Sequence, residues 1–151
     1  MATGKAHEFD SGVLAIILLT VFNIYLRDFM VAVLVASGAL AGIYITPDLD
    51  VDGWIRSKRK ATRSLGLVGY AWFVFWYPYS KAIRHRNWLS HAPLIGTMGR
   101  IVYLLTIPLT VAMATHTAVS GQAVSYIAIA SVGLACSDII HWLRDGRPLH
   151  K

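Results

Sequence analysis

The sequence predicts an all-α integral membrane protein with about four transmembrane helices and a short interfacial helix. Of the 151 residues, 56% are hydrophobic and 15% are charged, whereas soluble proteins carry about 25% charged residues. The mean hydropathy is +0.53. Four apolar stretches approach the roughly 17–25 residues that cross a bilayer as a helix. A soluble all-α bundle is the alternative fold.

The predicted spans form a single membrane domain over residues 1–151. Charged residues precede the first apolar run and no small-residue cleavage site follows it, so we expect the first span to be retained. Gly38 and Gly42 lie four residues apart in the second span, a spacing typical of close helix packing. The four spans cover residues 11–26, 29–46, 101–118 and 122–143.

The basic residues predict the topology. Nine of the fourteen Lys and Arg residues lie between residues 47 and 100, and three more lie near the C-terminal end. Because positively charged loops stay in the cytoplasm, we expect residues 47–100 to form a cytoplasmic segment and both termini to be cytoplasmic. Residues 67–79 are apolar but too short to span, and their Tyr and Trp content is typical of an interfacial helix. A buried segment capping the helical core is the alternative.

Asp48, Asp50 and Asp52 alternate directly after the second predicted span. Pro47 disfavours helical backbone at the residue before it, so we expect an extended chain in which alternate side chains share a face. Carboxylates on one face repel each other unless a cation or arginines neutralise them. A calcium loop is excluded, because its twelfth position requires Glu and is Arg59 here. The alternative is an acidic turn neutralised by the basic residues that follow.

Two further clusters follow apolar stretches on the same predicted side of the membrane. His85 and His91 lie six residues apart; they are either metal ligands, a common role of neutral imidazole, or ordinary surface histidines. Asp138, His141 and Asp145 have the i, i+3, i+7 spacing that shares one helix face. Asp138 either joins His141 on a cation or forms a packing pair with a histidine or an arginine. The other histidines are expected to be incidental: His7, His116 and His150.

Several motifs within residues 40–145 carry a family resemblance: Thr46-Pro47-Asp48-Leu49-Asp50, Pro78-Tyr79-Ser80-Lys81, His85-Arg86, Ser90-His91-Ala92-Pro93 and Gly96-Thr97-Met98-Gly99-Arg100. Through them the chain resembles small bacterial, often cyanobacterial, membrane proteins known as metal-binding proteins of unknown function. More distantly it is similar to inner-membrane metal-dependent hydrolases. The resemblance implies a multi-pass protein of the bacterial inner membrane. It also implies metal ligands at Asp48, Asp50, His85, His91, Asp138 and His141.

The first functional hypothesis is a metal-dependent hydrolase of phosphoester or lipid-like substrates at the cytoplasmic face. Mixed Asp and His ligation is typical of transition-metal sites, and we expect one or two ions of Zn²⁺ or Mn²⁺. An unligated carboxylate would act as general base and an arginine would bind an anionic substrate. The candidates are Asp52 and Asp145 for the base, and Arg86 and Arg100 for the anion. The alternative is a non-catalytic, metal-stapled subunit or assembly factor of a larger membrane complex.

The basic residues between 56 and 63 favour anionic lipid, or serve only to hold this segment in the cytoplasm. We therefore expect membrane lipids as partners, with an anionic lipid or phosphoester as substrate. Other membrane subunits are expected under the alternative hypothesis. Nucleic acid is not expected, because no nucleic-acid-binding fold accompanies the basic cluster.

Overall fold

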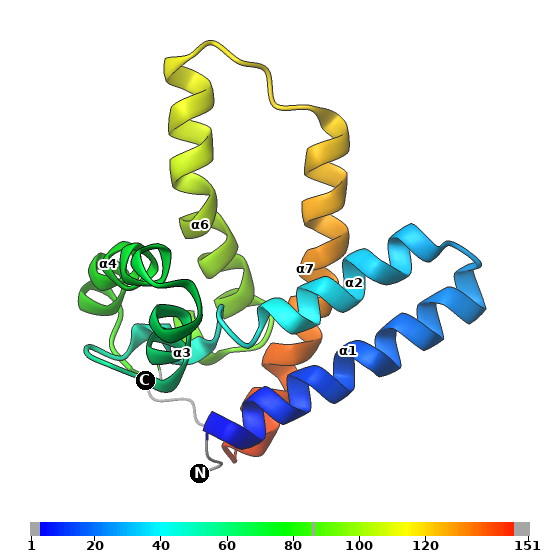
Figure 1. Ribbon diagram of the computed structural model, residues 1–151, viewed down its shortest axis with the longest axis horizontal. Coiled ribbons are helices and arrows are strands. Elements are labelled where there is room, and N and C mark those ends of the chain that lie inside the picture. Colours follow the sequence, from blue (N-terminus) through cyan, green and yellow to red (C-terminus); the bar gives the residue numbers. More distant parts are fainter. Residues whose placement is uncertain (1–3, 86, 147–151) are drawn as a thin grey trace.

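The computed structural model of the chain describes residues 4–85 and 87–146, and every regular element in this part is helical (Figure 1). The all-α prediction is confirmed for these residues. The elements are α1 (Gly4–Leu26), α2 (Phe29–Ala41), the 3₁₀ helix η1 (Pro47–Asp50), α3 (Arg56–Leu65), α4 (Leu67–Ala82), α5 (Trp88–His91), α6 (Ile95–Ala114) and α7 (Gly121–Arg144).

Three helices in the described part are long and apolar enough to cross a membrane, namely α1, α6 and α7, so the prediction of four was wrong. The second predicted span, 29–46, contains a 13-residue α-helix that ends at Ala41. Such a helix rises only about 20 Å, less than the roughly 30 Å of a hydrocarbon core. Beyond its end the chain turns over residues 42–44, and Thr46 is extended, with φ −91° and ψ 156°, as expected for a residue before proline.

The 16-residue helix α4 contains the apolar stretch that was predicted as an interfacial helix. Its Trp76 and Tyr79 are buried together with Leu49 of η1, and Tyr103 of α6 packs against them. This aromatic cluster fixes η1 beneath α4. Buried Lys58 of α3 donates from Nζ to the carbonyl oxygen of Val51 at 2.8 Å and holds the chain that leaves η1.

The backbones of α2 and α7 are in direct contact where they cross (Figure 1). A Cβ built on Gly38 would lie 1.8 Å from the carbonyl oxygen of Ala130, and one on Gly133 would lie 1.8 Å from that of Val35. No side chain fits at either position. The predicted close packing at the glycines of α2 is confirmed, and it places the C-terminal half of α7 beside the end of α2.

Candidate metal centre

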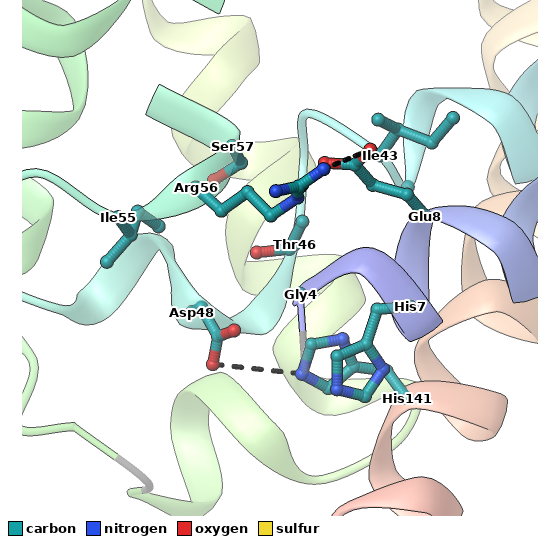
Figure 2. Close-up of a pocket in the computed structure, with 11 residues that line it drawn as sticks. Gly4, His7, Glu8, Ile43, Thr46, Asp48, Ile55, Arg56, Ser57 and His141 are labelled. Carbon is teal, nitrogen blue, oxygen red and sulfur yellow. Dashed lines mark hydrogen bonds and ion pairs between the residues drawn. The ribbon is translucent and has the colours of Figure 1, made fainter. Parts of the chain in front are cut away.

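Asp48, His91 and His141 converge from three separate elements, η1, α5 and α7. Oδ1 of Asp48 lies 3.6 Å from Nε2 of His91 and 3.7 Å from Nε2 of His141. Figure 2 shows Asp48 and His141 facing each other across the gap between their elements. The extended backbone before Pro47 turns Asp48 toward the C-terminal end of α7, and the short helix α5 brings in His91.

The two Nε2 atoms are buried and have no hydrogen-bond partner in the described structure. Their distances to Asp48 exceed the roughly 3.2 Å limit of a normal N–H···O bond. A buried nitrogen without a partner costs about 1–3 kcal/mol, so two that converge on one carboxylate oxygen require an explanation. Two imidazoles and a carboxylate form a donor set that suits a zinc-type divalent cation. The residues present therefore fit a metal ion.

The other nitrogen of His91 is held by neighbouring side chains. Nδ1 lies 3.0 Å from Oγ of Ser90 and 3.3 Å from Oδ2 of Asp50. The Ser90 hydroxyl donates to Asp50 at 2.6 Å, and Nδ1 of His85 lies 2.8 Å from the same carboxylate. Such partners orient a metal-ligating imidazole and select its tautomer. His85, Asp50 and His91 also form a second candidate ligand group.

Charge in this cluster is balanced between carboxylates and imidazoles. Burial lowers the pKa of His91, but Asp48 and Asp50 outweigh that effect and raise it from 6.5 to about 9. Burial raises the pKa of Asp48, yet the nearby imidazoles of His141 and His91, which favour its charged form, hold it well below its usual value. The pKa of Asp50 is lowered in the same way, against its burial, by His91, Ser90 and His85. A cation entering this site must therefore displace a proton from imidazole.

His7 of α1 joins the same cluster, although it was expected to be incidental. Its ring stacks on His141 with centroids 3.7 Å apart, and its Nε2 lies 3.3 Å from Oδ1 of Asp145. Oδ2 of Asp145 in turn lies 3.5 Å from Nε2 of His141. His7, His141 and Asp145 form a third candidate ligand group. The available signal was the predicted topology, which puts the N-terminus on the same side as the acidic clusters.

Asp138 and Arg100 form a buried ion pair next to the ligand cluster. The Asp138 carboxylate accepts hydrogen bonds from the hydroxyl of Thr97 and from the guanidinium of Arg100. Arg100 also donates to the carbonyl oxygen of Ser90 at 2.7 Å, beside His91. Asp138 belongs to none of the three candidate ligand groups among the described residues. This is the arginine packing pair that was the alternative for Asp138.

Three predicted site residues remain, and they lie in different places. The Asp52 carboxylate pairs with Nζ of Lys81 at 2.5 Å and is half exposed. Asp145 lies inside the cluster, as described above. Arg86 lies outside the described residues. The structure thus gathers Asp48, Asp50, His85, His91, His141 and Asp145 with His7.

A small cavity adjoins the ligand triad on the side of α1 and α3. Its volume is about 40 Å³, and Asp48, His141 and His7 contribute to its wall. Thr46 and Ser57 line it too, and their buried hydroxyl oxygens have no hydrogen-bond partner in the described structure. A cavity holds a water molecule once it exceeds about 10–15 Å³. Figure 2 shows Thr46, Ser57 and Asp48 on one side of this space and His7 with His141 on the other.

Helical architecture and a buried Asp/His donor set together define a metal-binding helical protein. The sequence model of the family described as uncharacterized metal-binding protein (DUF2227) matches residues 2–144, and the chain belongs to this family. The predicted resemblance to metal-binding proteins of unknown function is thereby confirmed. Neither the curated proteins nor the solved structures contain a match to the chain.

Proposed function

We propose that the protein is a membrane-embedded, metal-dependent hydrolase whose site lies at the cytoplasmic face. One observation carries the hydrolase: the donor triad is open on one side. The Asp48 side chain is 35% exposed, whereas those of His91 and His141 are 1% and 7% exposed. Asp48 also lines the cavity with the unpartnered hydroxyls. Catalytic metal sites keep such an open position, and structural sites are closed by protein ligands.

Membrane embedding is supported by the surface of the long helices. Only 11% of the apolar window of α1, and 22% of those of α6 and α7, is buried within the chain. Exposed apolar helices of this length need another apolar environment, which a bilayer supplies. Both the N-terminal end of α1 and the C-terminal end of α7 contribute to the ligand cluster. Arg56, in the basic segment that favours a cytoplasmic position, lines the cavity beside this cluster.

The chain's residues divide into distinct roles under this proposal. Asp48, His91 and His141 would hold the metal, and Zn²⁺ or Mn²⁺ bound there would act as a Lewis acid on a carbonyl or phosphoryl oxygen. Asp50, together with Ser90, orients the His91 ring from its Nδ1 side. The carboxylate of Asp145, whose Oδ2 lies 3.5 Å from Nε2 of His141, would serve as the general base that takes a proton from the attacking water.

The hydroxyls of Thr46 and Ser57 contribute the polar wall of the cavity. Because both oxygens are buried without a partner in the described structure, they are available to hydrogen-bond a substrate oxygen. Their placement opposite His7 and His141 leaves a water-sized space beside Asp48.

A metal-stapled, non-catalytic subunit is the second candidate. It is favoured by the separation of the ligands along the chain, because a cation would tie η1, α5 and α7 together at one point. Such a staple contributes directly to folding stability. The coordination distinguishes the two candidates, since a staple needs no open position.

The test combines metal content and turnover in detergent-purified protein. We expect about one equivalent of Zn²⁺ or Mn²⁺ in the wild type, together with hydrolysis of 4-nitrophenyl phosphate or a fluorogenic phosphodiester. His91→Ala and His141→Ala should lose both, while His116→Ala, in the turn just beyond the C-terminal end of α6, should lose neither. Metal binding with no turnover on any ester would overturn the hydrolase and leave the staple.

A further inference from the structure

Three hollows of different chemistry meet at Glu8. Glu8 lines the small cavity beside the ligand triad, a basic hollow on α3, and an apolar groove between α1 and α2. A basic hollow and an apolar groove that adjoin a candidate metal centre together form a binding site suited to an amphiphile. We propose that the substrate is an anionic phospholipid whose phosphate binds on α3 and whose acyl chain lies between α1 and α2. That the bound lipid is also hydrolysed rests on the function proposed above.

The basic hollow is built from one face of α3. Its cations have the i, i+3, i+4, i+7 spacing that shares one helix face, and they are Arg56, Arg59, Lys60 and Arg63. The hollow measures about 450 Å³ and is also lined by Trp54 and Ser64. Its one acidic lining residue is Glu8, which pairs with Arg56 and Lys60 at 2.7 and 3.0 Å.

Two arginines of this hollow keep their charge available. Arg59 and Arg63 are exposed and form no ion pair within the part of the chain that the structure describes. Arginine binds phosphate through paired, charge-assisted hydrogen bonds. Four cations against one carboxylate therefore favour an anion of more than one charge, such as a phosphate monoester. The side chain of Arg56 lines both this hollow and the metal-side cavity, and Figure 2 shows it in the wall of the cavity.

The groove between α1 and α2 has the chemistry of an acyl-chain site. It measures about 480 Å³ and is lined almost entirely by apolar residues, including Phe9, Ile16, Leu19 and Leu40. Gly12 forms part of its floor, and a Cβ at this position would meet no atom within 4 Å. The glycine therefore opens the groove rather than permitting helix contact, in contrast to Gly38.

The three hollows offer the kinds of surface that the parts of a phospholipid need: cations for the phosphate, a polar cavity for an ester group and an apolar groove for an acyl chain. Glu8 lies where the polar hollow, the cavity beside Asp48 and the apolar groove join. A lipid lying in the groove would present its headgroup to α3 and an ester linkage to the space beside the ligand triad. A soluble phosphate compound would leave the groove unused.

The experiment measures equilibrium binding of fluorescent phosphatidic acid and phosphatidylcholine to detergent-purified, metal-loaded protein. We expect tighter binding of phosphatidic acid, and a loss of about 10-fold or more in the double variant Arg59→Gln/Arg63→Gln. Gly12→Leu should weaken the binding of both lipids, because its side chain fills the groove without a clash within the protein. The matched controls are Arg84→Gln, an exposed arginine elsewhere, and Ala128→Leu, an exposed apolar site on α7. Neither control should change binding.

Three results would overturn the inference. Unchanged lipid binding in Gly12→Leu would exclude the groove. An equal loss of phosphatidic acid binding in Arg84→Gln and in the double variant would show that general surface charge, and not this hollow, attracts the lipid. Glycerol phosphate that binds as tightly as phosphatidic acid would show a soluble anion as the ligand. Metal content and melting temperature, measured on every variant, separate these outcomes from loss of the metal centre, and lipid binding without turnover would contradict only the hydrolase.

Discussion

His7 stacks on His141, with ring centroids 3.7 Å apart and ring planes inclined by 13°. The two residues belong to α1 and α7, so the contact joins the N-terminal end of the first helix to the C-terminal end of the last. Arg144 reinforces this junction through two 2.8 Å bonds to Asp10. A proposed ligand is thus supported on its flat face by a helix that supplies no atom to the Asp48, His91 and His141 triad.

Replacing His7 is expected to weaken metal binding without abolishing it. His7→Ala removes both the stack and the contact with Asp145, and changes to groups that orient a ligand cost about 10–100-fold in metal affinity. His7→Phe keeps the stack and should fall between Ala and wild type. Competition with a chromophoric chelator gives the affinities, with His116→Ala as control. An affinity unchanged in His7→Ala would show that the stack does not position His141.

The Arg100–Asp138 pair is expected to act on stability, and the metal stoichiometry should be preserved. Both side chains are buried, at 0% and 4% exposed. Removing one partner of a buried ion pair leaves an uncompensated charge and costs about 3–5 kcal/mol. Asp138→Asn and Arg100→Met should therefore lower the free energy of unfolding by about that amount. Denaturant titration in detergent measures it. A stable Asp138→Asn protein that has lost its metal would instead make Asp138 a ligand.

Metal binding and stability should respond to pH in opposite directions. Because the folded-state pKa of His91 is raised from 6.5 to about 9, its stabilising contribution is complete below pH 6.5 and is lost as pH rises through 9. The melting temperature of the metal-free protein should therefore fall as the pH rises from 6.5 to 9. Metal affinity should rise by about tenfold per pH unit over the same window, because binding displaces the imidazolium proton.

The control for this pH dependence is His91→Gln, in which the melting temperature of the metal-free protein should no longer fall over this window. Isothermal titration in buffers of different ionisation enthalpy counts the released proton. Metal affinity independent of pH between 6.5 and 9 would contradict the assignment of His91 as the protonated partner of Asp48 and Asp50.

Side chains added at the crossing of α2 and α7 should be severely destabilising. A Cβ at Gly38 or Gly133 would overlap a carbonyl oxygen of the other helix at 1.8 Å. Overpacking commonly costs about 1–3 kcal/mol and more where backbone must move. Gly38→Ala and Gly133→Ala should lower the melting temperature and also the metal content, because the crossing positions the end of α7. Gly12→Ala, in open space, is the matched control; equal effects at all three glycines would contradict this account.

The sequence predicted the helical class, the close packing of α2, and the convergence of the acidic and histidine clusters. It did so because hydropathy, small-residue spacing and charge are local signals that can be read from the sequence without knowing the tertiary structure. The prediction of a fourth span was wrong for a local reason as well. The apolar composition of residues 29–46 continues past the helix end at Ala41, into a turn over residues 42–44 and the extended Thr46 before Pro47.

The individual ligands could not be sorted by spacing alone. Asp138 and His141 share a face of α7, yet Asp138 meets Arg100 and Thr97 while His141 meets Asp48. Which partner a side chain meets depends on the rotation of α6 and α5 against α7, and this is set by tertiary packing. His7 was overlooked for the same reason, since its partner lies 134 residues further along the chain.

The distribution of the ligands along the chain has a consequence for biogenesis. Asp48 and His91 are synthesised well before His141, which follows them by 93 and 50 residues. The triad is therefore incomplete until nearly all of α7 has emerged from the ribosome and packed against α2. Because metal binding and folding are coupled, a metal held by this triad would report that translation had passed α7 and that α7 had packed, and a nascent chain arrested before residue 141 could not form the triad.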